Sequence, residues 1–495
     1  MREALVRYFE EHQRLIEAEA LSLLLTQPEP LRLSRQLIET ADALGPFVTR
    51  SMVERMLRVD PPSGGLPVAG GVATSTAVAA MAEPFRLLNP GFIAGVPGRT
   101  PLEAYESLFH HRYRSVHRWL KGRPDLPNLQ PIAALRGKEG TASIIGLVRD
   151  VRTTSEKKHV LVELDDESGS VAVLLLRDSP AAMAHLLSDE VVGLTLGLPK
   201  ESGRLPVVRA LHRPDVPAGR LPRAEGTSSR AMFLSDLHVG SRSFLGESWS
   251  ALAAFLRGEG PSPELAQEIE HVVIAGDLVD GIGIYPHQER DLAIHDIVEQ
   301  YAELGRRLAE LPSRLHIVVI PGNHDAVCPA EPQPALPEEL GRLLPANVRR
   351  LGNPSTFSLD GTVVAAYHGR SFDDLIPALP GADYGHPTEV MKRMLAMRHL
   401  APIYGGRTPI APLPHDGLLI DPVPEILVTG HAHTFGADRY RGVLLLNAST
   451  WQAETEYQRM RNITPIPARA AVVRLSDLSM SVFDFTVPER ALVAA

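Results

Sequence analysis

The stretch FLSDLHVGS, residues 233–241, places Asp236 and His238 two positions apart, directly after a short apolar run. Side chains alternate between the two faces of a strand, so residues i and i+2 point the same way. A carboxylate and an imidazole on one face are suitable donors for a metal ion. An isolated Asp-x-His pair is more often a solvated loop start, so the rest of the chain decides its meaning.

Four further apolar runs end in the same way, each in a glycine-containing turn that carries Asp, Asn or His. They are HVVIAGDLVDG with Asp277 and Asp280, LHIVVIPGNHDAV with Asn323, His324 and Asp325, TVVAAYHGRS with His368, and EILVTGHAHT with His431 and His433. Glycine lets the backbone turn tightly beside such groups. One such turn is usually structural, but five in order are not expected by chance. We therefore expect all five clusters at one edge of one sheet, a common position for active sites in α/β folds.

The number of donors predicts two divalent metal ions. Oxygen and nitrogen donors suit Mn first, with Fe, Zn or Mg as alternatives, and no pair of thiolates is available because Cys328 is the single cysteine. Two ions ~3.5–4 Å apart need a bridging carboxylate, and Asp277 is the natural bridge. We expect Asp236, His238 and His433 to complete one ion, and Asn323, His368 and His431 to complete the other.

Such a centre would hydrolyse a phosphate ester, because water held between two metal ions is acidified towards a pKa of ~7 and can attack phosphorus. His324 lies next to a predicted ligand but is not needed as one. It can therefore protonate the leaving oxygen or stabilise charge. We expect Asp325 to orient His324, as the acid partner orients the histidine of a triad.

The elements that position these residues belong to a chain of several domains, because 495 residues suggest three domains at ~150 residues each. Composition and hydrophobic period place the boundaries. The expected divisions are a helical module over 1–58, a flexible linker over 59–99, a helical connection over 100–139, a barrel over 140–215, a linker over 216–230 and a catalytic domain over 231–495.

The helical connection starts with a capping box at Thr100 and Glu103, with Pro101 in the first helical position. Its segment YESLFHHRYRSVHRWLKGR could follow a nucleic-acid backbone or pack its aromatic residues against the next domain, and the sequence leaves both open. The period of two over 140–215 predicts a small barrel of the OB type. Such barrels often bind single strands, but these strands lack exposed aromatic residues, which favours a structural role.

Composition excludes several classes of protein. A net charge of −9 argues against a generally basic nucleic-acid coat, although a local patch can still bind DNA. No apolar run approaches the ~18 residues of a membrane span, so no membrane partner is expected. The single cysteine rules out an internal disulfide framework and predicts a cytoplasmic location.

The ordered set Asp-x-His, Gly-Asp-x-x-Asp, Gly-Asn-His-Asp, a lone His and Gly-His-x-His resembles the calcineurin-like metallophosphoesterase superfamily. This resemblance implies a four-layer α/β/β/α domain, and the metal assignments agree with it. Phrases such as AGDLVDGIGIYPHQERDLAIHDIVEQY, YHGRSFDDLIP and STWQAETEYQ are similar to the small subunits of archaeal family D DNA polymerases. One departure is Ser449, where glycine is expected, and it should affect packing rather than metal binding.

The second resemblance implies a multidomain α+β subunit with two-metal 3′→5′ exonuclease activity, which proofreads during DNA replication. The implied partners are the large polymerase subunit, DNA with 3′ ends and, through the complex, a sliding clamp. Two alternatives remain. One is a non-catalytic scaffold like the eukaryotic polymerase B subunits, and the other is a phosphoesterase acting on small molecules or phosphoproteins. The complete set of ligands favours activity, and the predicted barrel favours a role beside a polymerase.

Overall fold

The computed structural model describes residues 83–93, 100–201, 203–217, 228–260, 262–460 and 463–486, together with short pieces of the first 53 residues. The chain forms two compact units, Met1–Ala80 and Met81–Ala495. In the first unit, helix α2 spans Ala18–Leu25, and strands β1 (Leu15–Ile16) and β2 (Phe47–Val48) pair in parallel. Most of the helical module predicted over 1–58 lies outside the described residues.

Helix α5 (Pro101–Leu120) begins in the second unit at the predicted residue. The Glu103 N–H donates to the Thr100 hydroxyl at 3.3 Å, and the Thr100 N–H donates to the Glu103 carboxylate at 2.9 Å. This capping box satisfies two N–H groups that the first turn would otherwise leave unpaired. The short helix η2 (Ile132–Leu135) then leads into the barrel.

Five strands close into a barrel in the order β4-β5-β6-β8-β7. They are β4 (Gly140–Thr153), β5 (Val160–Asp166), β6 (Gly169–Leu175), β7 (Val191–Leu198) and β8 (Val207–His212), with helix α6 (Pro180–Met183) between β6 and β7. Fully buried aliphatic side chains, including Ile144, Val162 and Leu194, fill the interior. The strands predicted over 140–215 are confirmed, and the assignment to the OB type stays a prediction.

Two six-stranded sheets form the rest of the second unit. The first has the order β12-β11-β10-β9-β18-β19, from β12 (Val348–Arg350), β11 (His316–Ile320), β10 (Ile269–Ala275), β9 (Arg230–Leu234), β18 (Arg469–Arg474) and β19 (Met480–Asp484). The second has the order β16-β17-β15-β14-β13-β3, from β16 (Phe435–Tyr440), β17 (Val443–Ala448), β15 (Ile426–Thr429), β14 (Thr362–Ala366), β13 (Ser355–Leu359) and β3 (Phe85–Asn89).

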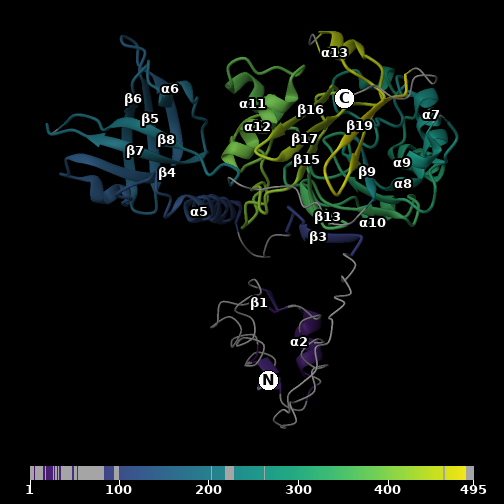
Figure 1. Cartoon of the computed structure of the whole chain (residues 1–495), viewed down its shortest axis with the longest axis horizontal. Coiled ribbons are helices and arrows are strands. Elements are labelled where there is room, and N and C mark those ends of the chain that lie inside the picture. The colour runs from purple at the N-terminus through teal and green to yellow at the C-terminus, as the bar shows by residue number, and fades with distance from the viewer. Residues whose placement is uncertain are drawn as a thin grey trace, which may run out of the picture. The chain divides into compact units, whose positions relative to one another are not determined.

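Helices cover the outer faces of both sheets (Figure 1). Those on the first sheet are α7 (Gly246–Leu256), α8 (Pro263–Glu268) and α9 (Ile297–Ala309), and those on the second are α11 (Phe372–Ala378) and α12 (Pro387–Met397). The short helices η3 (Gln288–Arg290), α10 (Glu338–Gly341) and α13 (Glu456–Met460) lie in the connections. A third core, which includes Phe233 and Phe357, fills the space between the sheets. Each sheet thus buries one face against helices and one against the other sheet.

Strand β3 corrects the predicted linker over 59–99. Its residues Phe85–Asn89 pair antiparallel with β13 and form the edge of the second sheet. The ring of Phe85 stacks on Phe357 at 5.6 Å, and Arg349 lies 4.1 Å over the Phe85 ring. A run of five residues whose burial does not alternate is too short to stand out beside a long Pro- and Gly-rich segment, so composition alone missed this strand.

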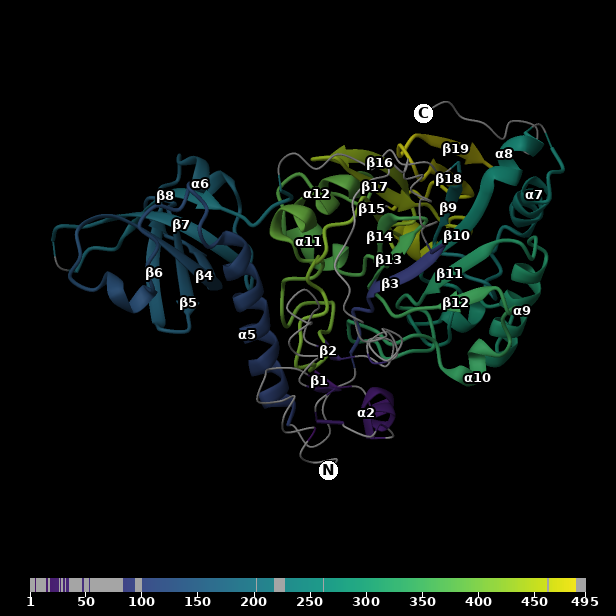
Figure 2. The ribbon, with the colours of Figure 1, turned by 60° about the horizontal axis from the view of Figure 1, so that its bottom comes forward.

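Helix α5 lies between the barrel and the two-sheet domain (Figure 2). The rings of Tyr105 and Phe109 lie 5.0 and 5.6 Å from the ring of Tyr404. Arg398 lies 4.1 Å over the ring of Trp119. These rings therefore pack against the two-sheet domain. Packing against the next domain along the chain, the barrel, is confirmed by Tyr113, whose hydroxyl donates to the Ile145 carbonyl at 3.4 Å.

Arg112 forms the centre of a buried polar network at this junction. Its Nε donates to Asp416 at 2.6 Å, and its Nη1 donates to the carbonyls of Asp189 at 2.9 Å and Pro402 at 2.7 Å. His399 Nε2 lies 2.8 Å from the same Asp416 oxygen. Burial would raise the pKa of Asp416, but Arg112 and His399 together lower it well below its ordinary value. The network ties the barrel, α5 and the two-sheet domain together.

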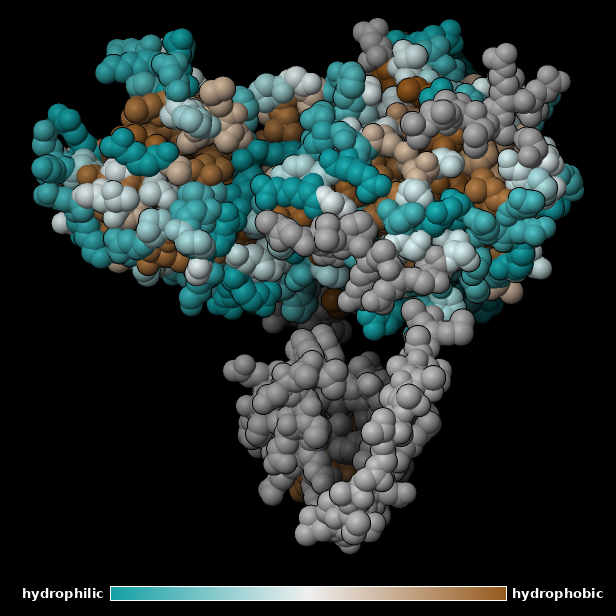
Figure 3. Space-filling view, viewed as in Figure 1, coloured by the Kyte–Doolittle hydropathy of each residue, from teal (hydrophilic) through white to brown (hydrophobic). Residues whose placement is uncertain are grey.

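The face drawn in Figure 3 mixes hydrophilic and hydrophobic residues over the barrel and the two-sheet domain. Isolated hydrophobic residues are normal on protein surfaces and indicate no particular partner. Among the helices that the structure describes, none is long and apolar enough to cross a membrane.

We predict that Arg112→Ala destabilises this junction by ~3–5 kcal/mol, because it leaves the buried Asp416 carboxylate without its cation. Hydrogen exchange of the α5 amides in the full chain measures the effect. Because the pKa of Asp416 is lowered in the folded protein, the contribution of the pair is present above the ordinary value of 3.8 and is lost as pH falls below it.

The matched control is Arg114→Ala on the same helix. Arg114 pairs with Glu167, and their side chains are 70% and 45% exposed. An exposed pair of this kind contributes ~0–1 kcal/mol. Equal exchange rates in the two variants would show that the Arg112 network does not hold the junction.

Candidate metal centre

The five predicted clusters follow strands from both sheets. In the first sheet, β9 leads to Asp236 and His238, β10 to Asp277, and β11 to Asn323; in the second, β14 leads to His368 and β15 to His431 and His433. The prediction that they share one edge of one sheet is therefore wrong. The sheets stack with the carboxyl ends of these strands on the same side, so side chains from both meet between them.

Five of these side chains come from residues in the left-handed backbone conformation. The φ angle is +52° at Asp236, +50° at His238, +48° at Asp277, +64° at His431 and +55° at His433. Residues other than glycine rarely adopt this region. A hydrogen bond joins the turn after β9 to the turn after β10, since the His238 N–H donates to the Asp277 carbonyl at 3.0 Å. A concentration of backbone strain at one place is typical of functional sites.

Glycines allow the backbone to lie against the predicted ligands. A Cβ atom at Gly322 would lie 2.2 Å from Asp277 Oδ1. At Gly430 it would lie 1.8 Å from Ser235 Oγ and 2.2 Å from Asp236 Oδ2. Any side chain at these two positions would displace the carboxylates, so glycine here permits a close approach of the backbone to the predicted ligands.

Ser449, where glycine was expected, is buried and also left-handed, with φ of +68°. Its hydroxyl donates to the carbonyl of Ile466 and accepts from the N–H of Arg469 at 3.3 Å. These contacts offset part of the strain and keep the side chain within the β17–β18 connection. This arrangement agrees with an effect on packing.

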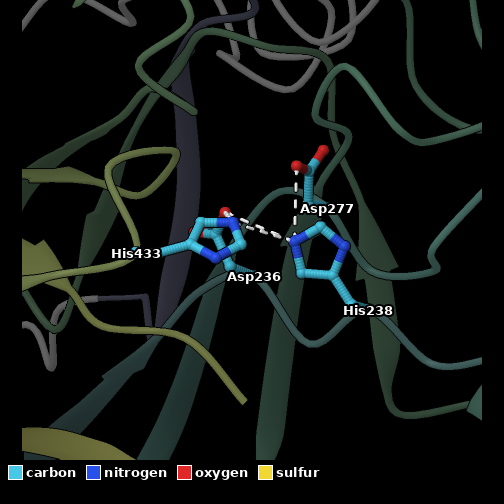
Figure 4. Close-up of side chains that lie close together, drawn as sticks. All are labelled: Asp236, His238, Asp277 and His433. Atoms are coloured by element: carbon cyan, nitrogen blue, oxygen red, sulfur yellow. Dashed lines mark hydrogen bonds and ion pairs between the residues drawn. The ribbon is translucent and has the colours of Figure 1, made fainter. Parts of the chain in front are cut away.

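The first donor cluster contains Asp236, His238, Asp277 and His433, with donor atoms within 4.8 Å of one another (Figure 4). His433 Nε2 lies 3.2 Å from Asp236 Oδ1, and His238 Nε2 lies 3.7 Å from Asp277 Oδ2. The two Nε2 atoms of His238 and His433 face each other at 3.0 Å. Two imidazole nitrogens and two carboxylates directed at one point fit a divalent cation.

The second donor cluster contains Asp277 again, together with His368 and His431. His368 Nε2 lies 3.3 Å from Asp277 Oδ2 and 3.1 Å from Asn323 Oδ1. The structure thus brings all seven predicted ligands together and makes Asp277 common to both clusters. A shared carboxylate is what a pair of neighbouring ions requires.

His324 lies at the edge of the first cluster, but Asp325 does not hold it there. His324 Nδ1 lies 2.7 Å from the backbone carbonyl of Asp280. The Asp325 carboxylate instead accepts from the N–H groups of Leu278 and Gly322 and from the Tyr301 hydroxyl at 2.8 Å. The prediction that Asp325 orients His324 is wrong, because this buried carboxylate is used to hold the ligand turns in place.

Three residues that the sequence did not assign hold the imidazoles. Asp280 Oδ1 lies 3.0 Å from His238 Nδ1 and accepts from Gln452 Nε2 at 3.0 Å. Gln458 Nε2 lies 2.6 Å from His433 Nδ1, and Asp373 Oδ1 lies 3.3 Å from His431 Nε2. Carboxylates behind histidine ligands fix the orientation of the ring. Asp280 could have been identified as the second Asp of Gly-Asp-x-x-Asp, whereas no spacing marks Asp373 or Gln458.

The charges in this cluster favour a bound cation. Burial would raise the pKa of Asp277, but the neighbouring imidazoles, His368 first, lower it well below its ordinary value. Burial would lower the pKa of His238, but Asp236 and Asp280 raise it to about 10. The buried carboxylates therefore require positive charge, which protonated imidazoles supply when no metal ion does. The donor set fits divalent cations on this ground as well.

A cleft of about 320 Å³ opens above both clusters. Beyond the donors it is lined by Arg370 and Arg407, by the rings of Tyr285 and Tyr384, and by Ile284. Basic and apolar groups beside a metal centre can receive a phosphate and an organic group on the same ligand.

Comparisons with known proteins identify the family. The family of B subunits of DNA polymerases alpha and epsilon matches residues 231–437. The chain is 42% identical to the DNA polymerase II small subunit of Archaeoglobus fulgidus over 379 residues, which cover 75% of each protein. It is also 42% identical to the DNA polymerase II small subunit of Methanothermobacter thermautotrophicus over 375 residues, or 74% of this chain and 76% of that one.

Among solved structures, the chain is similar to an archaeal phosphodiesterase with 11% sequence identity and a TM-score of 0.27, covering 51% of this chain and 98% of that one. The two polymerase subunits are the more informative relatives, because their identity extends over three quarters of this chain. The chain therefore belongs to the family of archaeal DNA polymerase II small subunits.

Proposed function

We propose that this polymerase subunit is a 3′→5′ exodeoxyribonuclease, which uses two divalent cations, Mn²⁺ first among the candidates, to proofread beside the large catalytic subunit. The observation that carries the proposal is the position of Asp277 between two complete donor clusters. A scaffold would not require seven converging donors, five of them on strained backbone.

In this proposal the donors divide as the sequence predicts. Asp236, His238 and His433 hold one cation, Asn323, His368 and His431 hold the other, and Asp277 holds both. Two bound cations would supply Lewis-acid activation of water and of the phosphodiester. Asp280 and Asp373 keep the rings of His238 and His431 in position from behind.

His324 is the proposed acid–base group. Its Nδ1 faces the Asp280 carbonyl, which leaves Nε2 on the opposite side of the ring, where it lies 3.9 Å from Asp277 Oδ2 and borders the cleft. Burial lowers the pKa of this imidazole in the protein without substrate, and the negative charge of a bound phosphodiester would act in the opposite direction and favour the protonated ring. A proton given to the leaving 3′ oxygen from this position would complete the cleavage.

The proposal includes an OB-type barrel with a structural role and, apart from strand β3, the domain divisions predicted above. Its partners are the large polymerase subunit, DNA with 3′ ends and, through the complex, a sliding clamp. A phosphoesterase for small phosphate esters is the second candidate, supported by the same donors. Membership of a polymerase subunit family favours DNA over small esters.

The test uses the full chain co-expressed with the large subunit, freed of metal and then supplied with Mn²⁺. We expect a single strand labelled at its 5′ end to shorten one nucleotide at a time, with slow turnover of p-nitrophenyl phosphate. Rapid turnover of that monoester with intact DNA would support the second candidate. Inertness towards both substrates would contradict an enzymatic role.

We predict that Asp277→Ala reduces exonuclease activity below detection and removes both equivalents of metal, because this carboxylate belongs to both clusters. Asp236→Ala is the matched variant, since Asp236 belongs to one cluster, and it should lose one equivalent first. Metal analysis of the purified chains together with the nuclease rate measures both. Two retained equivalents in Asp277→Ala would remove this residue from the bridging position.

We predict that His324→Ala keeps both metal equivalents and slows hydrolysis by about 10²–10⁴-fold, the usual contribution of a positioned acid–base group. The rate profile should also lose the pH dependence that its imidazole causes. Asp325→Asn is the comparison, because it should lower stability and leave that pH dependence in place. Loss of one metal equivalent in His324→Ala would instead identify His324 as a ligand.

A further inference from the structure

Arg407 differs from the other cation that lines the cleft. The Arg370 guanidinium is half-buried and donates from Nη1 to the carbonyl of Pro329 at 2.8 Å. Arg407 is exposed, and within the described residues its guanidinium has no hydrogen-bond or salt-bridge partner. A planar guanidinium with free donors is the side chain best suited to a phosphate group.

Hydrogen bonds hold the backbone of Arg407 in place, whereas its side chain is exposed. The Asp374 carboxylate at the start of α11 accepts from the N–H of Arg407 at 2.6 Å and from the N–H of Thr408 at 2.9 Å. A Cβ atom at Gly406 would lie 2.4 Å from Asp374 Oδ1, so the loop fits closely over this carboxylate. Arg407 therefore projects from an ordered turn, which lowers the entropy cost of binding a ligand.

The other end of the same loop is attached to the barrel and α5. The N–H of Tyr404 donates to Asp189 Oδ2 at 2.9 Å, and Asp189 lies between α6 and β7 of the barrel. The Tyr404 ring packs edge-on against Tyr105 and Phe109 of α5. A segment seven residues long, 402–408, thus connects the barrel to the wall of the cleft.

We propose that Arg407 binds a phosphate of the DNA strand other than the one being cleaved, and that Asp189 of the barrel is a positioning residue for it. The two metal cations would neutralise the phosphate that is cleaved. The guanidinium of Arg407 on the cleft wall is then available to bind the neighbouring phosphate of the same strand. The inference rests on the proposed nuclease function and deepens it. It gives the barrel a defined part in substrate recognition without requiring DNA to touch the barrel strands.

The first experiment measures binding of a short single-stranded oligodeoxynucleotide to the full chain, with Ca²⁺ in place of Mn²⁺. We expect Arg407→Ala to weaken binding about tenfold, the effect of one lost charge-assisted hydrogen bond. The slope of log affinity against log salt concentration should become shallower by ~0.7, the value for one phosphate contact on a single strand. Arg407→Lys should keep the slope and lose part of the affinity.

The second experiment compares hydrolysis of the same oligonucleotide and of bis(p-nitrophenyl) phosphate, which has one phosphate, in Mn²⁺. Arg407→Ala should raise KM for the oligonucleotide by a larger factor than KM for the small diester, because only the oligonucleotide carries a second phosphate. Asp189→Ala should act in the same direction by a smaller factor, and Asp189→Asn, which keeps an acceptor for the Tyr404 N–H, should restore KM. Arg342→Ala is the control, since this arginine is 75% exposed and lies outside the cleft.

The outcomes separate the two claims. An unchanged salt slope and KM in Arg407→Ala, with active wild-type protein, would overturn the phosphate contact and leave the nuclease function in place. Wild-type protein that hydrolyses neither substrate would contradict the nuclease function, while the salt slope in Ca²⁺ still decides whether Arg407 contacts phosphate. An unchanged KM in Asp189→Ala would overturn the positioning role of the barrel.

Discussion

The requirement to place positive charge around one buried carboxylate, Asp277, governs the centre and much of the fold around it. Its Oδ2 lies 3.3 Å from His368 Nε2, which the second sheet supplies, and 3.7 Å from His238 Nε2, which the first supplies. An isolated carboxylate at this depth would cost several kcal/mol. The two sheets stack over their shared apolar core so that imidazoles from both sheets surround this carboxylate, and these imidazoles, or bound metal ions, offset that cost.

The surrounding turns follow from this requirement. Asp and His residues in the left-handed conformation point the donor atoms into the site. Gly322 and Gly430 leave space for the carboxylates. The Asp325 carboxylate accepts hydrogen bonds from backbone N–H groups and does not face the substrate. At the junction, the hydrogen bonds of Arg112 link α5 to the barrel and to the two-sheet domain. The N–H of Tyr404, which donates to Asp189 of the barrel, adds a link between the barrel and the loop that carries Arg407.

The sequence predicted the seven converging donors well because each follows an apolar strand and a glycine-containing turn, which are local signals. It also predicted the start of α5, since a capping box lies within four residues. The sequence did not predict which strands share a sheet. It placed all the donors at the edge of one sheet, whereas they follow strands of two sheets. It missed strand β3 and the contacts of Asp373 and Gln458, because these depend on pairing between distant segments that no local period records.

The assignment of a role to Asp325 failed for a related reason. Adjacency in sequence suggested that it serves His324, but a tight turn sends neighbouring side chains in different directions. Tertiary contacts with Tyr301 and Leu278 decide where the carboxylate points. The sequence thus indicates which donor residues follow the strands, whereas the residues that contact those donors from behind can be identified only from the fold.

The central claim is that Asp277 joins two cations, and anomalous diffraction from crystals of the full chain containing Mn²⁺ tests it most directly. The account predicts two peaks on either side of the Asp277 carboxylate, separated by ~3.5–4 Å. One of them should lie against His238 and His433, and the other against His368 and Asn323. A single peak, or two peaks that do not share Asp277, would contradict the account.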